Sequence, residues 1–178
     1  MEIRTERLLL RQFRDEDLAP LASINRDPTV MEFIGSSLGD EQSKLMFDRI
    51  RLNWIKNGFG LFAVEVPGEA EFIGFTGLSI PSFQSHFTPC VEIGWRLASQ
   101  YWDHGYATEA ANAVKHFGFI NICLTEIVSF TASKNLRSQH VMEKIGLFRD
   151  VKDDFEHPNI AKGNPLSLHF LFRGSSSS

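Results

Sequence analysis

Two segments of this chain share the same order of a strand-like run, a polar turn and a helix pattern. In the first, VEIGWRLA (91–98) leads through the turn WDHG (102–105) into small apolar residues at helical spacing. In the second, LTEIVSFTA (124–132) leads into a helix pattern over 135–145, which Gly146 ends as a C-terminal cap. Two such units predict a domain in which helices pack against a sheet, the α/β class.

The rest of the sequence completes one domain. The predicted order of elements is β-α-α-β-β-β-α-β-α-β-β, a single-domain α/β fold with a mixed central sheet flanked by helices. Besides the two units, strands are expected over 5–13, 61–66, 71–80, 147–156 and 165–173, and helices over 14–25 and 40–57. The segment 27–40 has no regular pattern. We expect the domain to cover 1–174, with a Ser-rich tail over 175–178.

The charge and composition of the chain exclude several classes of protein. Its 178 residues carry a net charge of −4, whereas nucleic-acid-binding proteins usually have a strong basic excess, so we expect no nucleic-acid partner. No apolar run approaches the roughly 20 residues of a membrane-spanning helix. No signal peptide is recognisable at the N-terminus, so we expect no membrane partner.

The cysteines and histidines predict neither a disulfide nor a metal site. The two cysteines, Cys90 and Cys123, both lie in apolar contexts, as the reduced thiols of cytoplasmic proteins do. The six histidines are scattered without the spacing of metal ligands. We therefore expect a cytoplasmic location and no metal cofactor.

The turn before the helix at Gly105 is suited to an anion. A helix start has unpaired backbone N–H groups and about half a positive charge, so it is a frequent phosphate site. Ala107, Ala110 and Ala111 keep the first turns small, which lets the helix backbone approach the sheet closely. An ordinary core helix with a glycine in its entry turn has the same pattern, and the sequence alone leaves both interpretations open.

Cationic residues flank the start of the second helix. Lys134 and Arg137 lie on either side of Asn135, although a positive charge near a helix N-terminus opposes the helix dipole. A phosphate bound between them would make the same arrangement favourable. A solvated surface face explains these residues equally well.

In their order and spacing, the motifs resemble the GNAT acyltransferase family, whose members transfer an acetyl group from acetyl-CoA to an amine. The resemblance is to the branch that contains the ribosomal-protein-alanine N-acetyltransferases, and it implies a GNAT-like fold. The glycine and alanine of WDHGYA fit the family's phosphate loop, and Trp102 stands where the family has Gln or Arg. The resemblance covers nearly the whole chain and depends on TERLLLRQFRDEDL (5–18), WDHGYA (102–107), NLRSQHVMEKIGLF (135–148) and DFEHPNIAKGNPLSLHFLFR (154–173).

The resemblance also implies a cofactor and the residues that hold it. The cofactor is acetyl-CoA, and the backbone N–H groups of residues 104–108 hold its pyrophosphate. Trp95 and Leu97 pair their backbone with the pantetheine arm, and Asn135 binds the pantetheine or the thioester region. Lys134, Arg137 and His104 are candidates for the outer phosphates. The predicted cofactor-binding residues are Trp95, Leu97, His104, Gly105, Tyr106, Ala107, Thr108, Lys134, Asn135 and Arg137.

By the same resemblance, Glu92 on the strand VEIGWRLA is the candidate general base. A surface glutamate paired with Arg96 is the alternative. Many GNAT enzymes protonate the leaving thiolate with a tyrosine seven residues after the asparagine, but Met142 occupies that position here and cannot donate a proton. Ser138, one turn after Asn135, is the nearest replacement, and a plain helix-surface serine is the alternative.

We therefore predict an acetyl-CoA-dependent N-acetyltransferase that transfers the acetyl group directly, because neither cysteine has the base and orienting group of a covalent nucleophile. The acceptor is a primary amine, either a protein N-terminus or a small-molecule amine. Phe33, Trp54 and Phe87 are candidate residues of its pocket, with packing in the core or on the surface as the favoured alternative for each. The alternative function is a non-catalytic acyl-CoA-binding sensor or interaction module. We expect a monomer or a homodimer.

Overall fold

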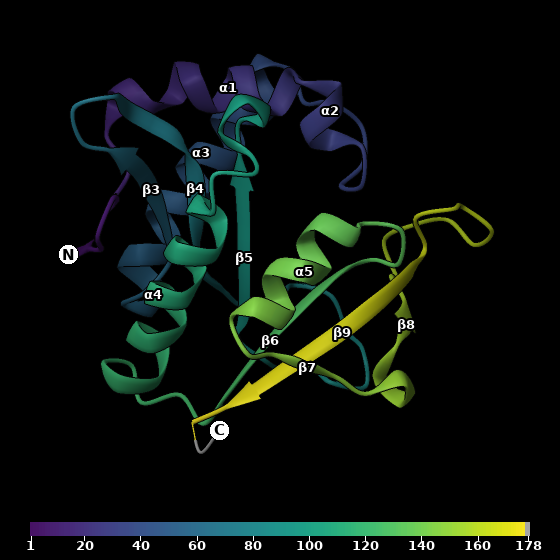
Figure 1. Ribbon diagram of the computed structural model, residues 1–178. Helices are drawn as coiled ribbons and strands as arrows, with labels where there is room; N and C mark the ends of the chain where they lie inside the picture. The colour runs from purple at the N-terminus through teal and green to yellow at the C-terminus, as the bar shows by residue number, and fades with distance from the viewer. Residues whose placement is uncertain (177–178) are drawn as a thin grey trace.

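The computed structural model of the protein describes residues 1–176 and contains one mixed sheet flanked by helices (Figure 1). The strands are β1 (Glu2–Arg4), β2 (Leu9–Arg11), β3 (Leu61–Val66), β4 (Ala70–Ser79), β5 (Glu92–Leu97), β6 (Glu126–Ala132), β7 (Phe148–Arg149), β8 (Phe155–Glu156) and β9 (Leu168–Ser175). The α-helices are α1 (Leu18–Arg26), α2 (Pro28–Met31), α3 (Asp40–Asn57), α4 (Tyr106–Ile120) and α5 (Leu136–Lys144). The predicted single-domain α/β fold is confirmed. Ser175, expected in the tail, is the last residue of β9, and 177–178 lie outside the described residues.

The sheet changes direction once along its width. Its strand order is β1-β2-β3-β4-β5-β6-β9-β7, with β8 paired to β9. Only β5 and β6 are a parallel pair among the described strands, and α4 lies on the crossover between them. These two strands are paired only at Glu92 and Val128, so they separate beyond Glu92. In Figure 1, β5 runs upright whereas β6 and β9 run obliquely away from it.

Apolar side chains fill both faces of the sheet. Ala110 and Ala111 of α4 are completely buried against one face, which confirms that small residues let this helix lie close to β4 and β5. Phe47 of α3 packs with Phe75 of β4 and with Leu21 of α1 on the other face. Helices therefore cover both faces of β4, and the edge of β5 that faces β6 is left for the site.

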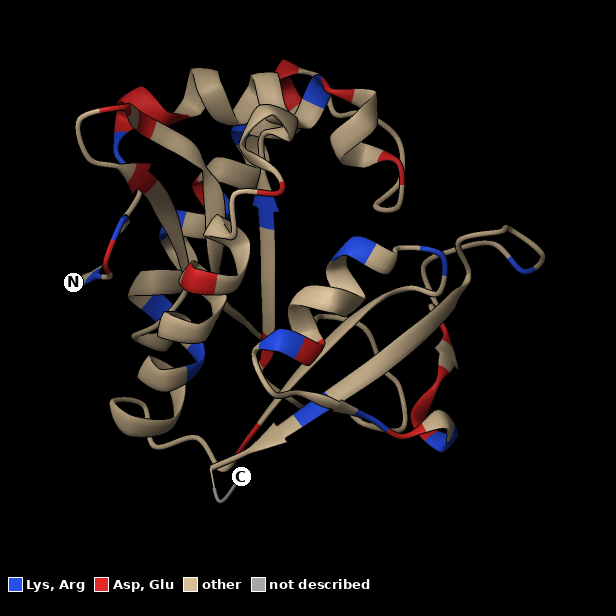
Figure 2. Cartoon of the chain, in the orientation of Figure 1, with Lys and Arg blue, Asp and Glu red and all other residues tan. Residues whose placement is uncertain are grey.

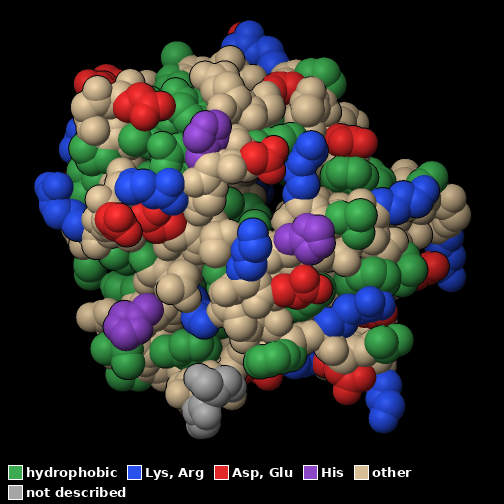
Figure 3. Space-filling model, viewed as in Figure 1, with side chains coloured by type: hydrophobic (Ala, Val, Ile, Leu, Met, Phe, Trp, Pro, Cys, Tyr) green, Lys and Arg blue, Asp and Glu red, His purple; other side chains and the backbone are tan. Residues whose placement is uncertain are grey.

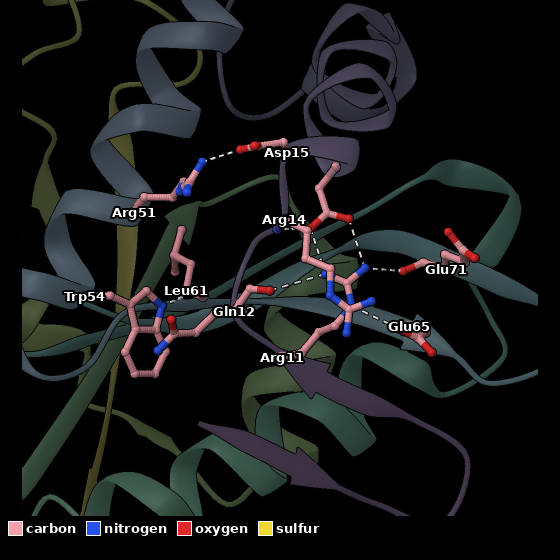
Figure 4. A network of polar contacts seen from close by, with 10 residues as sticks. Arg11, Gln12, Arg14, Asp15, Arg51, Trp54, Leu61, Glu65 and Glu71 are labelled. Atoms are coloured by element: carbon pink, nitrogen blue, oxygen red, sulfur yellow. Dashed lines mark hydrogen bonds and ion pairs between the residues drawn. The ribbon is translucent and has the colours of Figure 1, made fainter.

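A buried ion-pair network ties β2 to the chain around it (Figure 4). The Arg11 side chain is 3% exposed, and its Nη1 and Nη2 donate to both carboxylate oxygens of Asp17 at 2.7 and 2.9 Å. Its Nε donates to Glu65 at 2.9 Å, and Nη2 also donates to the Glu71 carbonyl at 2.7 Å. The hydrogen bonds that Arg11 donates to Asp17 raise the pKa of Arg11 above its usual value. This buried cation is therefore fully paired.

The first predicted strand, 5–13, is instead a turn followed by the second strand of a short hairpin. β1 and β2 pair antiparallel, and the Thr5 N–H donates to the Leu8 carbonyl at 3.0 Å across the turn. The Thr5 hydroxyl donates to the Glu109 carboxylate of α4 at 2.6 Å. This contact spans 104 residues, and the local alternation of residues does not reveal it.

Two further segments differ from the prediction. The segment 27–40 contains the short helix α2, because the Asp27 carboxylate accepts the Thr29 N–H at 2.9 Å and Pro28 stands at the first helical turn, where no N–H is needed. The segment 147–156 contains only the two-residue strands β7 and β8, with a 3-10 turn between them. By contrast, α3 and β3 have the predicted bounds.

Charged residues of both signs are distributed over the chain, and no single sign dominates its fold (Figure 2). Within residues 1–176, no helix combines the length and apolarity needed to cross a membrane. The electrostatics of the site therefore depend on the charged residues next to it and not on an overall excess of one sign.

Candidate active site

A cavity of about 300 Å³ lies beside the C-terminal half of β5. Its wall comes from three parts of the chain: the end of β5 with the turn into α4, the first turns of α5, and α2 with the residues after it. The space-filling view shows a hollow on this face of the molecule (Figure 3). The predicted site residues that line the cavity are Trp95, Leu97, Gly105, Tyr106, Ala107, Thr108, Asn135, Arg137 and Ser138. Glu92, His104 and Lys134 do not line it.

The start of α4 presents free backbone donors to the cavity. Gly105 caps the helix in the left-handed conformation, with φ +81°, which glycine adopts without strain. The first N–H bonded within the helix is that of Glu109, to the Gly105 carbonyl at 3.0 Å. The N–H groups of Tyr106, Ala107 and Thr108 therefore have no partner inside the helix, and all three residues line the cavity.

Arg7 holds this turn in place, and sequence reasoning missed it. Its Nη1 donates to the His104 carbonyl at 2.9 Å and its Nε to the Glu109 carboxylate at 2.7 Å. Its guanidinium also lies 4.8 Å from the centre of the Tyr106 ring. A Cβ on Gly105 would meet Arg7 Nη2 at 3.3 Å. The turn therefore depends on a residue about 100 positions away in sequence, for which the local pattern gave no signal.

The backbone of β5 has one free edge toward the cavity. The Gly94 carbonyl and the Ala98 N–H bond to β4, so the alternate residues point their backbone groups the other way. On that side, the Leu97 carbonyl accepts the Trp102 indole N–H at 2.9 Å. The N–H and C=O of Trp95 and the N–H of Leu97 therefore face the gap where β5 and β6 separate.

Asn135 caps α5 and connects two hydroxyl groups. Its Oδ1 accepts the Ser138 N–H at 3.2 Å, and its Nδ2 donates to the hydroxyls of Ser138 and Thr131, both at 3.0 Å. Both amide hydrogens are therefore used within the protein, and Oδ1 keeps one lone pair for a further donor. Met142, at the position of the family's tyrosine, is 2% exposed and belongs to the core.

Glu92 lies outside the cavity, at the start of β5. Burial raises the pKa of its carboxyl to about 8, and a 3.5 Å contact with the Ser79 hydroxyl opposes that rise. The alternative of a surface pair with Arg96 is wrong, because no ion pair in residues 1–176 joins the two. At pH 7 the Glu92 carboxyl is therefore largely neutral, and only the small ionised fraction can accept a proton.

Basic side chains gather along α5 on the cavity side. The Arg137 guanidinium lies 4.7 Å from the centre of the Trp102 ring, and both residues line the cavity. His140 and Lys144, which the sequence analysis missed, line the cavity one and two turns further along. Lys and Arg residues occur near both ends of α5 in Figure 2. The signal was present in the sequence as the 137, 140 and 144 spacing of one helix face.

The third wall of the cavity comes from α2 and the residues after it. Thr29, Glu32 and Phe33 line this wall, so of the three predicted aromatic residues only Phe33 reaches the cavity. Trp54 is in the core, with its indole N–H donating to the Leu61 carbonyl at 2.8 Å. Phe87 packs among other phenylalanines under the last strands. For these two rings the alternative of core packing is therefore confirmed, and neither lines the pocket.

Cys90 and Cys123 are free, and burial raises the pKa of Cys90 to about 11, so its thiol stays protonated at neutral pH. No cluster of His, Cys, Asp and Glu within residues 1–176 is arranged to hold a metal ion.

Comparisons with known proteins agree with this arrangement. A family model described as acetyltransferase (GNAT) domain matches residues 7–147. The uncharacterised N-acetyltransferase YnaD of Bacillus subtilis (strain 168) is 32% identical over 164 residues, which cover 92% of this chain and 91% of that protein. A crystal structure of a GNAT-family acetyltransferase from Bacillus anthracis is 30% identical, with a TM-score of 0.80 over 100% of both chains.

More distant structures share the fold. The ribosomal-protein-S5-alanine acetyltransferase from Vibrio fischeri has a TM-score of 0.77 over 100% of this chain and 98% of its own, at 17% identity. The fold and the sequence matches together define an acetyltransferase of the GNAT class. The chain belongs to the GNAT acetyltransferase family, as its motifs predicted.

Proposed function

We propose that the chain, as one acetyltransferase domain whose last strand ends at Ser175, transfers an acetyl group from acetyl-CoA to a primary amine by direct attack. The observation that supports this most is the convergence of three donor groups on one cavity: the start of α4, the free edge of β5 and the start of α5. Burial keeps the Cys90 thiol protonated, and neither Cys90 nor Cys123 lines the cavity, so no acyl-enzyme is proposed.

The residues present fit the cofactor. The unpaired N–H groups of Tyr106, Ala107 and Thr108 suit its pyrophosphate, and Gly105 supplies the left-handed turn that exposes them. The free backbone groups of Trp95 extend this surface with amide-like partners for the pantetheine arm. When bound, acetyl-CoA supplies the thioester carbonyl that the amine attacks. His104 and Lys134 are proposed only for phosphates outside the cavity.

The proton of the attacking amine needs an acceptor. Glu92 lies three residues, or about 10 Å along the strand, from Trp95, so it accepts the proton through water rather than directly. An α-amine with a pKa near 8 costs only about 1–1.5 kcal/mol to deprotonate at pH 7, whereas a lysine amine costs roughly 4–5 kcal/mol. A base with a pKa of about 8 suits the first kind of acceptor.

The remaining steps use groups on β5 and α5. A nitrogen–carbon bond forms and the carbon–sulfur bond breaks, so negative charge develops first on the carbonyl oxygen and then on sulfur. The Trp95 N–H is the proposed donor to the oxygen. Ser138, whose hydroxyl accepts from Asn135, is free to donate its own proton toward sulfur.

Calorimetric titration with acetyl-CoA tests the proposal, with Gly105→Glu as the variant. We expect micromolar binding by the wild type and none by the variant, because a carboxylate at Gly105 would repel the pyrophosphate. The left-handed φ of +81° strains any side chain at this position, so the variant should melt a few degrees lower, and Gly105→Ala, which has the same strain without the charge, is the control. CoA release with a panel of amines then separates an enzyme from an acyl-CoA-binding module. Binding without release by any amine would favour the module, and no binding would overturn both.

A further inference from the structure

The molecule contains one buried and one half-buried arginine with opposite surroundings. Arg11 is paired with Asp17 and Glu65 in the network of Figure 4. Arg96, on β5, has no carboxylate partner in any ion pair of residues 1–176. Its Nη1 donates to the Asn25 side-chain oxygen at 2.6 Å. A largely desolvated cation without a counter-ion is costly, and an anionic ligand would offset that cost.

The unpaired part of the Arg96 guanidinium is one edge of its plane. Nη1 is used by Asn25, and the plane lies 5.3 Å from the centre of the Phe75 ring. Nε is buried without any partner, and it is the one such side-chain atom among the described residues. Nη2 donates to no described residue either and keeps contact with solvent. Nε and Nη2 point the same way, and this edge matches the two oxygens of a carboxylate.

Arg96 lines the same cavity as the cofactor-binding residues, but it extends toward the side of α1 and α3. The start of α4 lies on the other face of the sheet. Phe33 and Glu32 of the α2 wall line the same cavity, so Arg96 belongs to the part left for the acceptor. Burial lowers the pKa of Arg96 to about 10, so it remains charged at neutral pH.

We propose that Arg96 binds a carboxylate of the acceptor, so that the substrate is a small amine that also carries a carboxylate, the chemistry of an amino acid. This rests on the proposed acetyltransferase function and names its substrate class. A cavity of about 300 Å³ suits a small molecule. Glu32 and Asp103, also on the wall, favour the cationic amine end. A protein N-terminus has the amine but no carboxylate close to it, and a diamine has a second cation in place of the carboxylate. Neither would pair with Arg96.

The proposal is tested by measuring kcat/KM for a series of amino acids of increasing chain length, from glycine to 6-aminohexanoate. Each acid is compared with its own amide. The amide keeps the amine and removes the anion. For the preferred chain length we expect kcat/KM at least about 30-fold higher for the acid than for the amide, mainly through KM. Equal rates for acid and amide in the wild type, or a preference for 1,4-diaminobutane or trialaninamide, would overturn the proposal without touching the acetyltransferase function.

Variants of Arg96 assign the preference to this residue. Arg96→Met keeps the packing against Phe75 and removes the charge. It should lower kcat/KM for the acid by at least about 30-fold, change that for the amide by less than about 3-fold, and leave acetyl-CoA binding unchanged. The kcat/KM of Arg96→Lys for the acid should lie between those of the wild type and Arg96→Met. Arg51→Met, at an exposed arginine, is the matched control. An equal loss for acid and amide would mean a structural role only.

A binding experiment keeps the proposal testable even where no amine is turned over. N-acetylglycine and N-acetylglycinamide, a product and its uncharged counterpart, are titrated into wild-type protein saturated with CoA. We expect the acid alone to bind, and Arg96→Lys to weaken it. Failure of turnover with this selectivity intact would count against the acetyltransferase function, whereas equal binding of the two compounds would count against Arg96. Because the two compounds are compared on the wild-type protein, this result does not depend on whether any variant folds.

Discussion

Glu92 is a carboxylic acid in surroundings that oppose its charge. Because burial raises its pKa to about 8, roughly a tenth of it is ionised at pH 7. If Glu92 accepts the amine proton, Glu92→Gln should lower kcat by about 30- to 1,000-fold and change the Kd of acetyl-CoA less than about 2-fold. The wild-type rate should rise up to about pH 8 and then level off, because only the carboxylate acts as a base.

The pH profile is best measured with an aromatic amine, which stays neutral throughout, so that any rise belongs to the enzyme. Glu156→Gln, an exposed glutamate on β8, is the matched control. A variant that keeps both the wild-type rate and the wild-type pH profile would remove Glu92 from the mechanism.

Individual residues differ in how well the sequence predicts them. Gly105 and Ala107 could be predicted because their role follows from helix geometry within a few positions. Arg7 and Arg96 could not, since each derives its meaning from a partner 102 or 71 residues away, Glu109 and Asn25. An arginine has the same appearance in sequence whether it is paired, as here at Arg7, or left with a free edge. Local pattern contains no information about such partners.

Among the elements, β2, β3 and the turn before α1 are joined by one buried charge. Asp17 is 2% exposed and accepts two hydrogen bonds from Arg11 and one, at 2.7 Å, from the Arg14 N–H. Asp17→Asn should destabilise the protein by about 2–4 kcal/mol, because it leaves a buried cation short of a partner. This corresponds to a fall in melting temperature of roughly 5–15 °C, measurable by calorimetry.

Asp15 is the matched control for that prediction. It pairs with Arg51 but its side chain is 83% exposed, so Asp15→Asn should cost less than about 1 kcal/mol. Equal destabilisation by both variants would show that burial of the Arg11 pair adds nothing.

The elements themselves were predictable in proportion to their regularity. α3 and β3 have long or clean patterns and begin and end where expected. The four-residue α2 is held by one Asp27 cap, and the two-residue β7 and β8 exist only through pairing with β9. Elements this short are stabilised by their neighbours in space rather than by their own residues, so periodicity cannot show them.

At the scale of the whole molecule, the site exists because two strands stop pairing. β5 and β6 share one register pair and then separate, and the free backbone edge of β5 becomes the floor of the cavity. The sequence predicts both strands but not their divergence, because a strand with a free edge has the same alternation as a paired one. Only the family resemblance indicated a cofactor along this edge.

The raised pKa of Glu92 also makes the stability of the whole protein depend on pH. The carboxyl titrates near 8 in the fold and near its ordinary 4.5 in the unfolded chain, so between these values the folded state binds more protons. Its contribution to stability is therefore fully present below about pH 4.5 and is lost as the pH rises through 8. Above about pH 8 Glu92 is ionised in both the folded and the unfolded state, so it no longer makes stability depend on pH.

Glu92→Gln removes this titration, so the difference in unfolding free energy between the two proteins isolates it. The variant should gain on the wild type by about 1–3 kcal/mol between pH 5 and pH 9, because solvent in contact with the half-buried Glu92 screens part of the effect. Burial lowers the pKa values of His157 and His169, so these two residues destabilise the protein as the pH falls. Both proteins contain them, so their effect cancels in the difference. Urea unfolding at intervals of one pH unit measures the difference. A difference that stays constant over this range would mean that Glu92 titrates normally in the fold, and its suitability as the base for an α-amine would fail with it.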